Sequence, residues 1–196
     1  LWGYELMMTN VATRPELVKH ACERYLERSI EGVRAAVSLG ADAVWIEECL
    51  TDQVNPEAFS SLNVPATRRL VEEIRLRGLK SIYYYCGDPA GKWEHIIAIG
   101  ADALALEEGK KGFTNDIGQV AEMMRGRCVL FGNIDAVHVL QDGSDETLRA
   151  HILRQIEAAR ANGRRFVMSA GSPVTPGTPV SRVKRYCEMV HELGHL

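Results

Sequence analysis

The sequence predicts an α/β protein in which five βα units follow one another and their strands pair in parallel. Short apolar runs rich in β-forming residues alternate with segments of helical periodicity along the whole chain. A strand that follows a helix and precedes another helix pairs in parallel with its neighbour through a right-handed crossover. The 196 residues are 46% apolar, enough for one domain with a core, so we expect a single domain over residues 1–196.

The individual elements follow from apolar runs, capping residues and glycines. The predicted strands are 43–46, 81–85, 103–106, 128–132 and 165–169. The predicted helices are one that starts near Thr13, 57–77 with an interruption at Pro65, 92–99, one capped by Asp116, one capped by Ser144 and 180–193. Thr13 with Glu16 fits a capping box, and Pro15 suits the first turn of the same helix.

One segment of nine residues occurs twice. GlyAlaAspAlaValTrpIleGluGlu at 40–48 and GlyAlaAspAlaLeuAlaLeuGluGlu at 100–108 are identical at six of nine positions. Each copy combines a helix-ending glycine, a buried strand and two carboxylates at the carboxyl end of that strand. Repeated βα units of this kind favour a barrel, although the reuse of a GlyAlaAsp turn explains the likeness equally well.

Charge and cysteine content exclude several classes of protein. The net charge is −3, which excludes a general electrostatic affinity for nucleic acid or anionic membranes. No run of 18 apolar residues could span a bilayer, and no basic segment with a following apolar run predicts a signal peptide. The five cysteines are far apart in sequence, which is typical of reduced thiols, so we expect a cytoplasmic protein.

Polar side chains gather where the predicted strands end. In parallel α/β folds the carboxyl ends of the strands form the functional edge. The residues there are Glu47, Glu48, Cys49, Tyr84, Tyr85, Cys86, Asp88, Glu107, Glu108, Asn133, Asp135, Ser169 and Ser172. Side chains alternate along a strand, so only one of each adjacent pair can face the middle. Carboxylates with a thiol could hold a metal or transfer protons, whereas strand ends also collect polar residues simply because they are solvated.

With the strand ends placed, the chain resembles the C-terminal part of the uroporphyrinogen decarboxylase superfamily, which also contains zinc-dependent, corrinoid-linked methyltransferases. The resemblance rests on 40–48 through AsnProGluAlaPhe at 55–59, TyrTyrCysGlyAsp at 84–88, GlyAsnIleAsp at 132–135 and GlySerProValThrProGlyThrPro at 171–179. It implies a partial (β/α)8 barrel, with these five βα units as its last five. The first residue is Leu1, and 196 residues are fewer than the roughly 250 of a complete barrel, which agrees with three missing units.

The chain departs from both branches of this superfamily. The methyltransferases hold zinc with a His-x-Cys pair and a Cys in the last loop; Tyr84 replaces the His, Cys86 is kept and Ser172 replaces the last Cys. Cys86 together with Glu48 and Glu107 could still supply three ligands. The decarboxylases carry a functional His where Ser172 stands, and a Ser hydroxyl is a poor proton donor near neutral pH.

The resemblance implies an enzyme, and we predict methyl transfer between a corrinoid, or another methyl donor, and a small-molecule or thiol acceptor. Cys86, helped by Glu48 and Glu107, would place a zinc ion or the acceptor. The residues expected to be catalytic are Glu48, Asp135 and Ser172, and those expected to contact a cofactor are Tyr84, Asp88 and Asn133.

Two alternatives stay open. One is a decarboxylase that acts on a tetrapyrrole or another carboxylate-rich substrate. The other is a non-catalytic binding or subunit-like fragment. A small-molecule substrate, a corrinoid protein and a second copy of the chain are the expected partners, because an unclosed parallel sheet gives a reason to associate.

Overall fold

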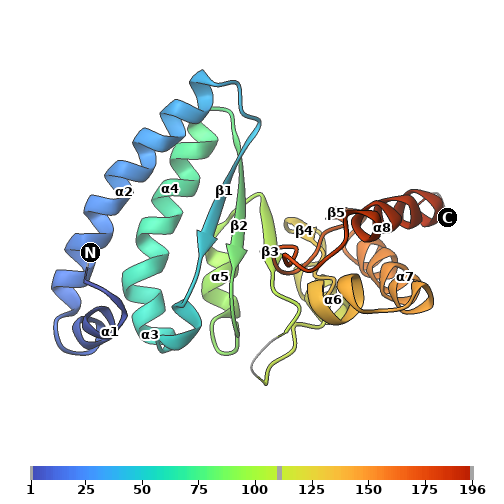
Figure 1. Ribbon diagram of the computed structural model, residues 1–196. Coiled ribbons are helices and arrows are strands. Elements are labelled where there is room, and N and C mark those ends of the chain that lie inside the picture. The colour runs from blue at the N-terminus through green and yellow to red at the C-terminus, as the bar shows by residue number, and fades with distance from the viewer. Residues whose placement is uncertain (1, 110–111, 195–196) are drawn as a thin grey trace. The chain divides into compact units, whose positions relative to one another are not determined.

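The computed structural model describes residues 2–109 and 112–194 (Figure 1). The chain divides into two compact units, Leu1–Asp102 and Ala103–Leu196. Each unit has strands, helices and a hydrophobic core of its own. That residues 1–196 form a single domain stays a prediction. No helix in the described part of the chain is both long and apolar enough to cross a bilayer.

The first unit is built on two parallel strands, β1 (Ala43–Glu48) and β2 (Lys80–Tyr85). They pair in register from Ala43 opposite Lys80 to Glu48 opposite Tyr85. The helices are α1 (Tyr4–Thr13), α2 (Pro15–Ser38), η1 (Thr51–Gln53), α3 (Pro56–Ala58), η2 (Phe59–Asn63), α4 (Val64–Leu76) and α5 (Trp93–Ile99).

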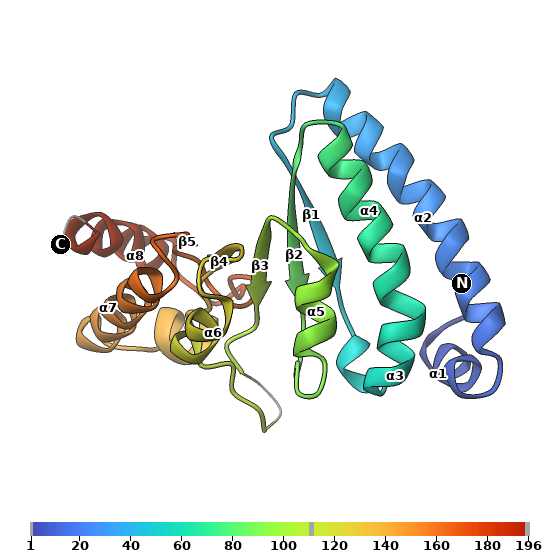
Figure 2. The ribbon, with the colours of Figure 1, turned by 180° about the vertical axis from the view of Figure 1, so that it is seen from behind.

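Two long helices cover one face of β1. Val33 of α2 and Ile74 of α4 form a buried cluster against which Val44 and Ile46 of β1 pack. Figures 1 and 2 show α2 and α4 side by side along the strand pair. Side chains alternate along a strand, so Trp45 points to the other face, where its side chain is 47% exposed.

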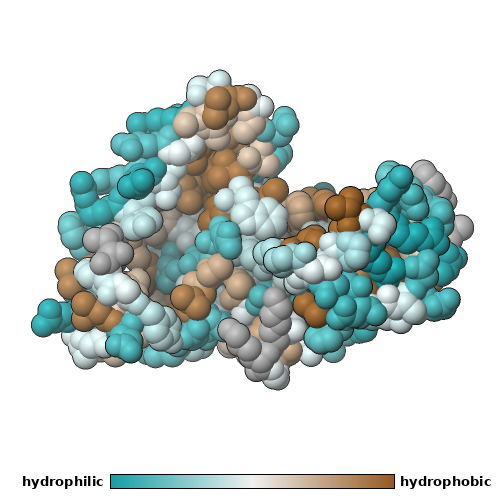
Figure 3. All heavy atoms as spheres, in the orientation of Figure 1, coloured by the Kyte–Doolittle hydropathy of each residue, from teal (hydrophilic) through white to brown (hydrophobic). Residues whose placement is uncertain are grey.

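Apolar side chains are also exposed at one end of this unit. Leu39 follows α2 and Leu76 ends α4, and they are 85% and 80% exposed. Both helices end at the top of Figure 1, and Figure 3 shows apolar residues gathered at that end.

The second unit contains three strands, β3 (Ala103–Leu106), β4 (Val129–Phe131) and β5 (Phe166–Val167). They are parallel and lie in chain order. The helices are α6 (Ile117–Met124), η3 (Ala136–Gln141), α7 (Asp145–Ala161) and α8 (Val180–Leu193). The core joins Leu148 and Ile152 of α7 to Met189 and Leu193 of α8.

In the described residues, each of the five strands is followed by helical structure, and every strand pair within a unit is parallel. This confirms the predicted α/β class with five βα units, as in a partial (β/α)8 barrel. The predicted caps are also confirmed: Asp116 accepts bonds from the backbone N–H of Gly118 and Gln119, and Ser144 accepts one from Thr147.

Two predictions near the first helices need correction. Thr13 does not cap a helix, because it is the last residue of α1 and its hydroxyl donates to the Thr9 carbonyl at 2.7 Å. Pro15 starts α2 instead, which suits a residue without an N–H. Pro65 does not interrupt a helix either: it lies in the first turn of α4, directly after the π-helical turn η2.

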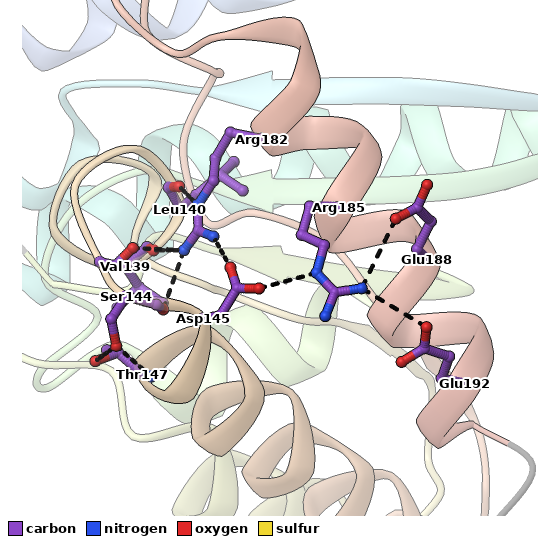
Figure 4. A network of polar contacts seen from close by, with 10 residues as sticks. Val139, Leu140, Ser144, Asp145, Thr147, Arg182, Arg185, Glu188 and Glu192 are labelled. Atoms are coloured by element: carbon purple, nitrogen blue, oxygen red, sulfur yellow. Dashed lines mark hydrogen bonds and ion pairs between the residues drawn. The ribbon is translucent and has the colours of Figure 1, made fainter.

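One arginine fastens the start of α8 to the preceding helices (Figure 4). Arg182 Nε donates to the Leu140 carbonyl at 2.7 Å, and Nη2 donates to the Gly143 carbonyl at 2.6 Å. Nη1 bonds Asp145 Oδ1 at 2.5 Å. Arg182 is 14% exposed, whereas Arg185, which bonds the other oxygen of Asp145, is 39% exposed. The guanidinium therefore satisfies carbonyls at the end of η3 that no helix continues.

We predict that Arg182→Ala lowers the free energy of unfolding by about 3 kcal/mol, because it leaves buried carbonyls without donors. Arg185→Ala is the matched control and should cost less than about 1 kcal/mol, since its ion pairs are solvated. Urea unfolding followed by circular dichroism measures both. Equal losses in the two variants would contradict the role assigned to Arg182.

Candidate functional site

The carboxyl group of Glu48 lies on the helix-covered side of the first unit. Glu48 is the last residue of β1 and follows Val44 and Ile46 in the alternation of that strand. Its Oε1 accepts a hydrogen bond of 2.9 Å from Nδ2 of Asn63, the last residue of η2. The π-helical turn therefore brings an amide donor to a carboxyl group that the strand directs away from solvent.

Burial raises the pKa of Glu48 to about 7, although the hydrogen bond from Asn63 acts in the opposite direction. The group can therefore give or take a proton near neutral pH. Cys22 of α2 lies nearby. Burial, with a smaller contribution from the charge of Glu48, raises the pKa of its thiol, so Cys22 stays protonated.

A cavity of about 520 Å³ opens beside Glu48. Its walls come from α1, α2, the end of β1, the segment after it and η2. The described lining residues are Trp2, Gly3, Tyr4, Met7, Met8, Val11, Val18, Ala21, Cys22, Tyr25, Glu48, Cys49, Leu50, Thr51, Val54, Leu62 and Asn63. Most are apolar or aromatic, so the carboxyl group borders an apolar pocket that is partly open to solvent.

Tyr84 and Cys86, two of the predicted residues at the end of β2, lie on a different side from Glu48. Tyr84 is buried and packs on Trp45, with ring centroids 5.4 Å apart. Cys86 is two residues after Tyr84, so its side chain points to the same side of the sheet as that of Tyr84. The backbone N–H of Cys86 donates to the Glu48 carbonyl at 3.0 Å. Asp88 accepts a bond from the Ala90 N–H at 2.9 Å, which fixes a turn. The unit therefore does not bring Glu48 and Cys86 to one face.

In the second unit, Ser172 contacts Glu108, a strand-end carboxylate to which no catalytic or metal-binding role was predicted. Ser172 Oγ donates to Glu108 Oε2 at 3.0 Å and to Oε1 at 3.3 Å. Gly171 allows this approach, because a Cβ there would lie 2.6 Å from the Glu108 backbone nitrogen. The repeat offered a signal for Glu108: it occupies the same place in its copy as Glu48 does in the first, whereas Glu107 does not.

Asn133 and Glu107 take part in a network of hydrogen bonds with Asn115, which lies in the loop after β3. Asn133 Nδ2 donates to the Asn115 carbonyl at 2.7 Å and more weakly to the Glu107 carbonyl at 3.4 Å. Asn115 Nδ2 donates to the same Glu107 carbonyl at 2.9 Å. All three residues are buried. Contact of Asn133 with a cofactor stays a prediction, and the structure assigns its amide to holding this loop.

Asp135 caps η3. Its Oδ1 accepts the N–H groups of Val137 and His138 at 2.8 Å each, and its Oδ2 lies 2.8 Å from His138 Nδ1. Partial burial acts to raise the pKa of Asp135, but the bonds from His138 and Val137 outweigh it and hold the pKa below its ordinary value. Asp135 is therefore a charged acceptor and not a proton donor at neutral pH.

A second, polar pocket of about 220 Å³ brings two predicted residues together in this unit. Asn133 and Asp135 line it with Glu108, and α7 contributes His151, Arg154 and Gln155. The catalytic roles predicted for Asp135 and Ser172 stay predictions.

The predicted zinc ligands do not form a set within one unit. Glu48 and Cys86 belong to the first unit and face different sides, and Glu107 belongs to the second. Within each unit, the described residues place no group of three His, Cys, Asp or Glu side chains that could hold a metal ion. Zinc generally requires three or four such ligands, so neither unit by itself fits the predicted site.

Parallel βα units with a pocket at the carboxyl end of a strand define a class of α/β folds related to the (β/α)8 barrel. Within that class, the family model of uroporphyrinogen decarboxylase (URO-D) matches residues 2–193. The chain belongs to this family.

Individual relatives agree with this assignment. A uroporphyrinogen decarboxylase from Gloeobacter violaceus is 24% identical over 97% of this chain and 53% of its own length. One from Bordetella petrii is 26% identical over 96% of this chain and 52% of its own. A methyltransferase from Methanosarcina mazei has the same fold, with a TM-score of 0.79 and 20% identity over 96% of this chain and 53% of that chain. The chain spans about half the length of these relatives.

We predict that the stability of the protein falls as pH rises from 5 to 8, in part because of Glu48. The folded state holds the Glu48 proton up to about pH 7, whereas the unfolded state loses it near 4.5. In Glu48→Gln, the decrease in the free energy of unfolding between pH 5 and 8 should be smaller by on the order of 2 kcal/mol. The effect is no larger because Glu48 keeps some contact with water. Urea unfolding across this range measures it; Glu72→Gln, an exposed change on α4, is the control. Parallel pH profiles for Glu48→Gln and the wild type would contradict the raised pKa.

We predict that Gly171→Ala lowers the free energy of unfolding by about 2 kcal/mol, because the new methyl group would press against the backbone of Glu108. Gly177→Ala is the matched control in the same loop. A Cβ there meets only the Gln141 side chain, at 3.2 Å, and that side chain can move. Thermal unfolding compares the two; an unchanged midpoint in Gly171→Ala would contradict the close approach.

Proposed function

We propose that this URO-D family chain transfers a methyl group from a corrinoid to a small-molecule or thiol acceptor, with Glu48 as the group that takes the acceptor's proton. The observation that supports this proposal is the position of the Glu48 carboxyl group beside the cavity. Glu48 borders the cavity of the first unit, and Asn63 holds its carboxylate at 2.9 Å. A proton acceptor held in a fixed position beside a ligand-sized pocket is what such a transfer requires.

The proposed step balances as follows. The X–H bond of the acceptor breaks, and its proton goes to the Glu48 carboxylate. The electron pair left on X forms the bond to the methyl carbon, while the bond between that carbon and its donor breaks and leaves its pair on the donor. A corrinoid, free or carried by a partner protein, supplies the activated methyl group. Asn63 keeps one carboxylate oxygen in place while the other receives the proton.

Glu48 and Cys86 face different sides of the strand pair and so do not form a shared metal site, and the proposed step uses Glu48 alone. The apolar side chains of the wall offer water few hydrogen-bonding partners beside Glu48.

Decarboxylation is the second candidate, and the matching family model and the names of the curated relatives favour it. Here protonated Glu48 would deliver its proton to the carbon from which carbon dioxide leaves. Ser172 stands where the family's decarboxylases carry a histidine and where its methyltransferases carry a cysteine, so this position departs from both candidates.

A methyl-transfer assay tests the proposal. The chain is incubated with methylcobalamin and para-methylbenzyl mercaptan, and the loss of methylcobalamin is followed by absorbance. We expect Glu48→Gln to lower kcat at least about 100-fold, because it removes the proton acceptor. Asn63→Ala should lower it about tenfold through the lost orienting bond. Glu72→Gln should match the wild type.

Full activity in Glu48→Gln would overturn the role of Glu48. If the wild type transfers no methyl group but releases carbon dioxide from a porphyrinogen, the second candidate replaces the first.

A further inference from the structure

The walls of the cavity beside Glu48 carry little charge. Among the described residues that line it, Glu48 is the one carboxylate, and none is Lys, Arg or His. Met7 and Met8 of α1 and Val18, Ala21 and Cys22 of α2 supply aliphatic and sulfur-containing surface. The polar side chain nearest the carboxyl group is Asn63, whose Nδ2 is already bonded to it.

This distribution decides which ligands can enter. A carboxylate on the ligand would leave water without gaining a counter-charge, and it would lie close to Glu48, which repels it whenever Glu48 is ionised. An apolar body, by contrast, gains from contact with aliphatic, aromatic and thioether side chains. The end of the ligand that reaches Glu48 and Asn63 finds hydrogen-bonding partners there.

We infer that the acceptor bound in this cavity is a neutral, largely apolar molecule with one polar X–H group, and not a carboxylate-rich compound. The inference rests on the proposed function, because it names the substrate class of the same site. The volume of about 520 Å³ suits a molecule of this kind, since pockets for small molecules measure roughly 300 to 1,000 Å³.

The lining assigns contacts to this acceptor. Its X–H group lies against the Glu48 carboxylate at the carboxyl end of β1. Its apolar body contacts side chains of α1 and α2, among them Met8 and Ala21.

Binding of two matched thiols, measured by isothermal titration calorimetry at pH 7, tests the inference. Para-methylbenzyl mercaptan and para-carboxybenzyl mercaptan share a ring and a thiol and differ in a methyl group against a carboxylate. The wild type should bind the methyl compound at least tenfold more tightly. Equal affinity, tighter binding of the carboxylate, or binding of neither compound would overturn the inference.

Two variants sharpen the test. Met8→Arg adds a cation to the wall and should strengthen binding of the carboxylate compound at least tenfold, whereas Leu6→Arg, on the same helix but outside the lining, should leave both affinities unchanged. Ala21→Trp fills the cavity and should abolish binding of both compounds, which keeps the inference testable if Met8→Arg does not fold. Binding that survives Ala21→Trp would overturn it.

Failure of the inference and failure of the proposed function give different results. Glu48→Gln should keep its affinity for the methyl compound while losing turnover. If the methyl compound binds as expected but methyl transfer never occurs, the substrate class stands and the proposed reaction falls. If methyl transfer occurs with the carboxylate compound at equal kcat/KM, the reaction stands and the substrate class falls.

Discussion

The alternation of side chains along β1 is the constraint on which the first unit depends. Parallel pairing in register with β2 fixes Val44, Ile46 and Glu48 on the side that α2 and α4 cover. The same rule sends Trp45 and Tyr84 to the opposite side. A one-residue shift would exchange these sets, exposing the core residues and removing Glu48 from its cavity. Because α2 and α4 cover only one side of β1, the alternation of side chains leaves Glu48, and not Glu47, on the covered side.

The second unit uses polar side chains to hold its strand ends together. Gln155 of α7, with its amide oxygen toward β4, accepts the N–H groups of Asn133 and Ile134 at 3.0 Å each. The loop after β5 is fixed at Ser172, which bonds Glu108, and at Thr178, which bonds Gln141. Buried networks of this kind rigidify the backbone when every member is satisfied. Ser172, which stands at the position of the superfamily's last Cys ligand, thus takes part in an ordinary hydrogen bond here.

Membership of the URO-D family and the departures from its motifs together shape the proposed chemistry. The family match covers residues 2–193, yet Tyr84 packs against Trp45 and Ser172 donates to a carboxylate. A tyrosine buried in this way has exchanged the metal-binding capacity of histidine for packing. The proposed chemistry therefore uses Glu48, whose carboxyl group borders the apolar cavity and accepts a hydrogen bond from Asn63.

The sequence by itself determined the α/β class, the five parallel strands, the caps at Asp116 and Ser144 and the bounds of α8, because periodicity and capping are local properties. It also placed Glu48 at the end of a strand. Only the tertiary structure decided that Glu48 and Cys86 face apart, that Glu108 and not Glu107 meets Ser172, and that Asn63 reaches Glu48 from 15 residues away. These outcomes depend on where the π-helical turn η2 and the loop after β5 place their side chains in space. The spacing of residues along the sequence does not determine those positions.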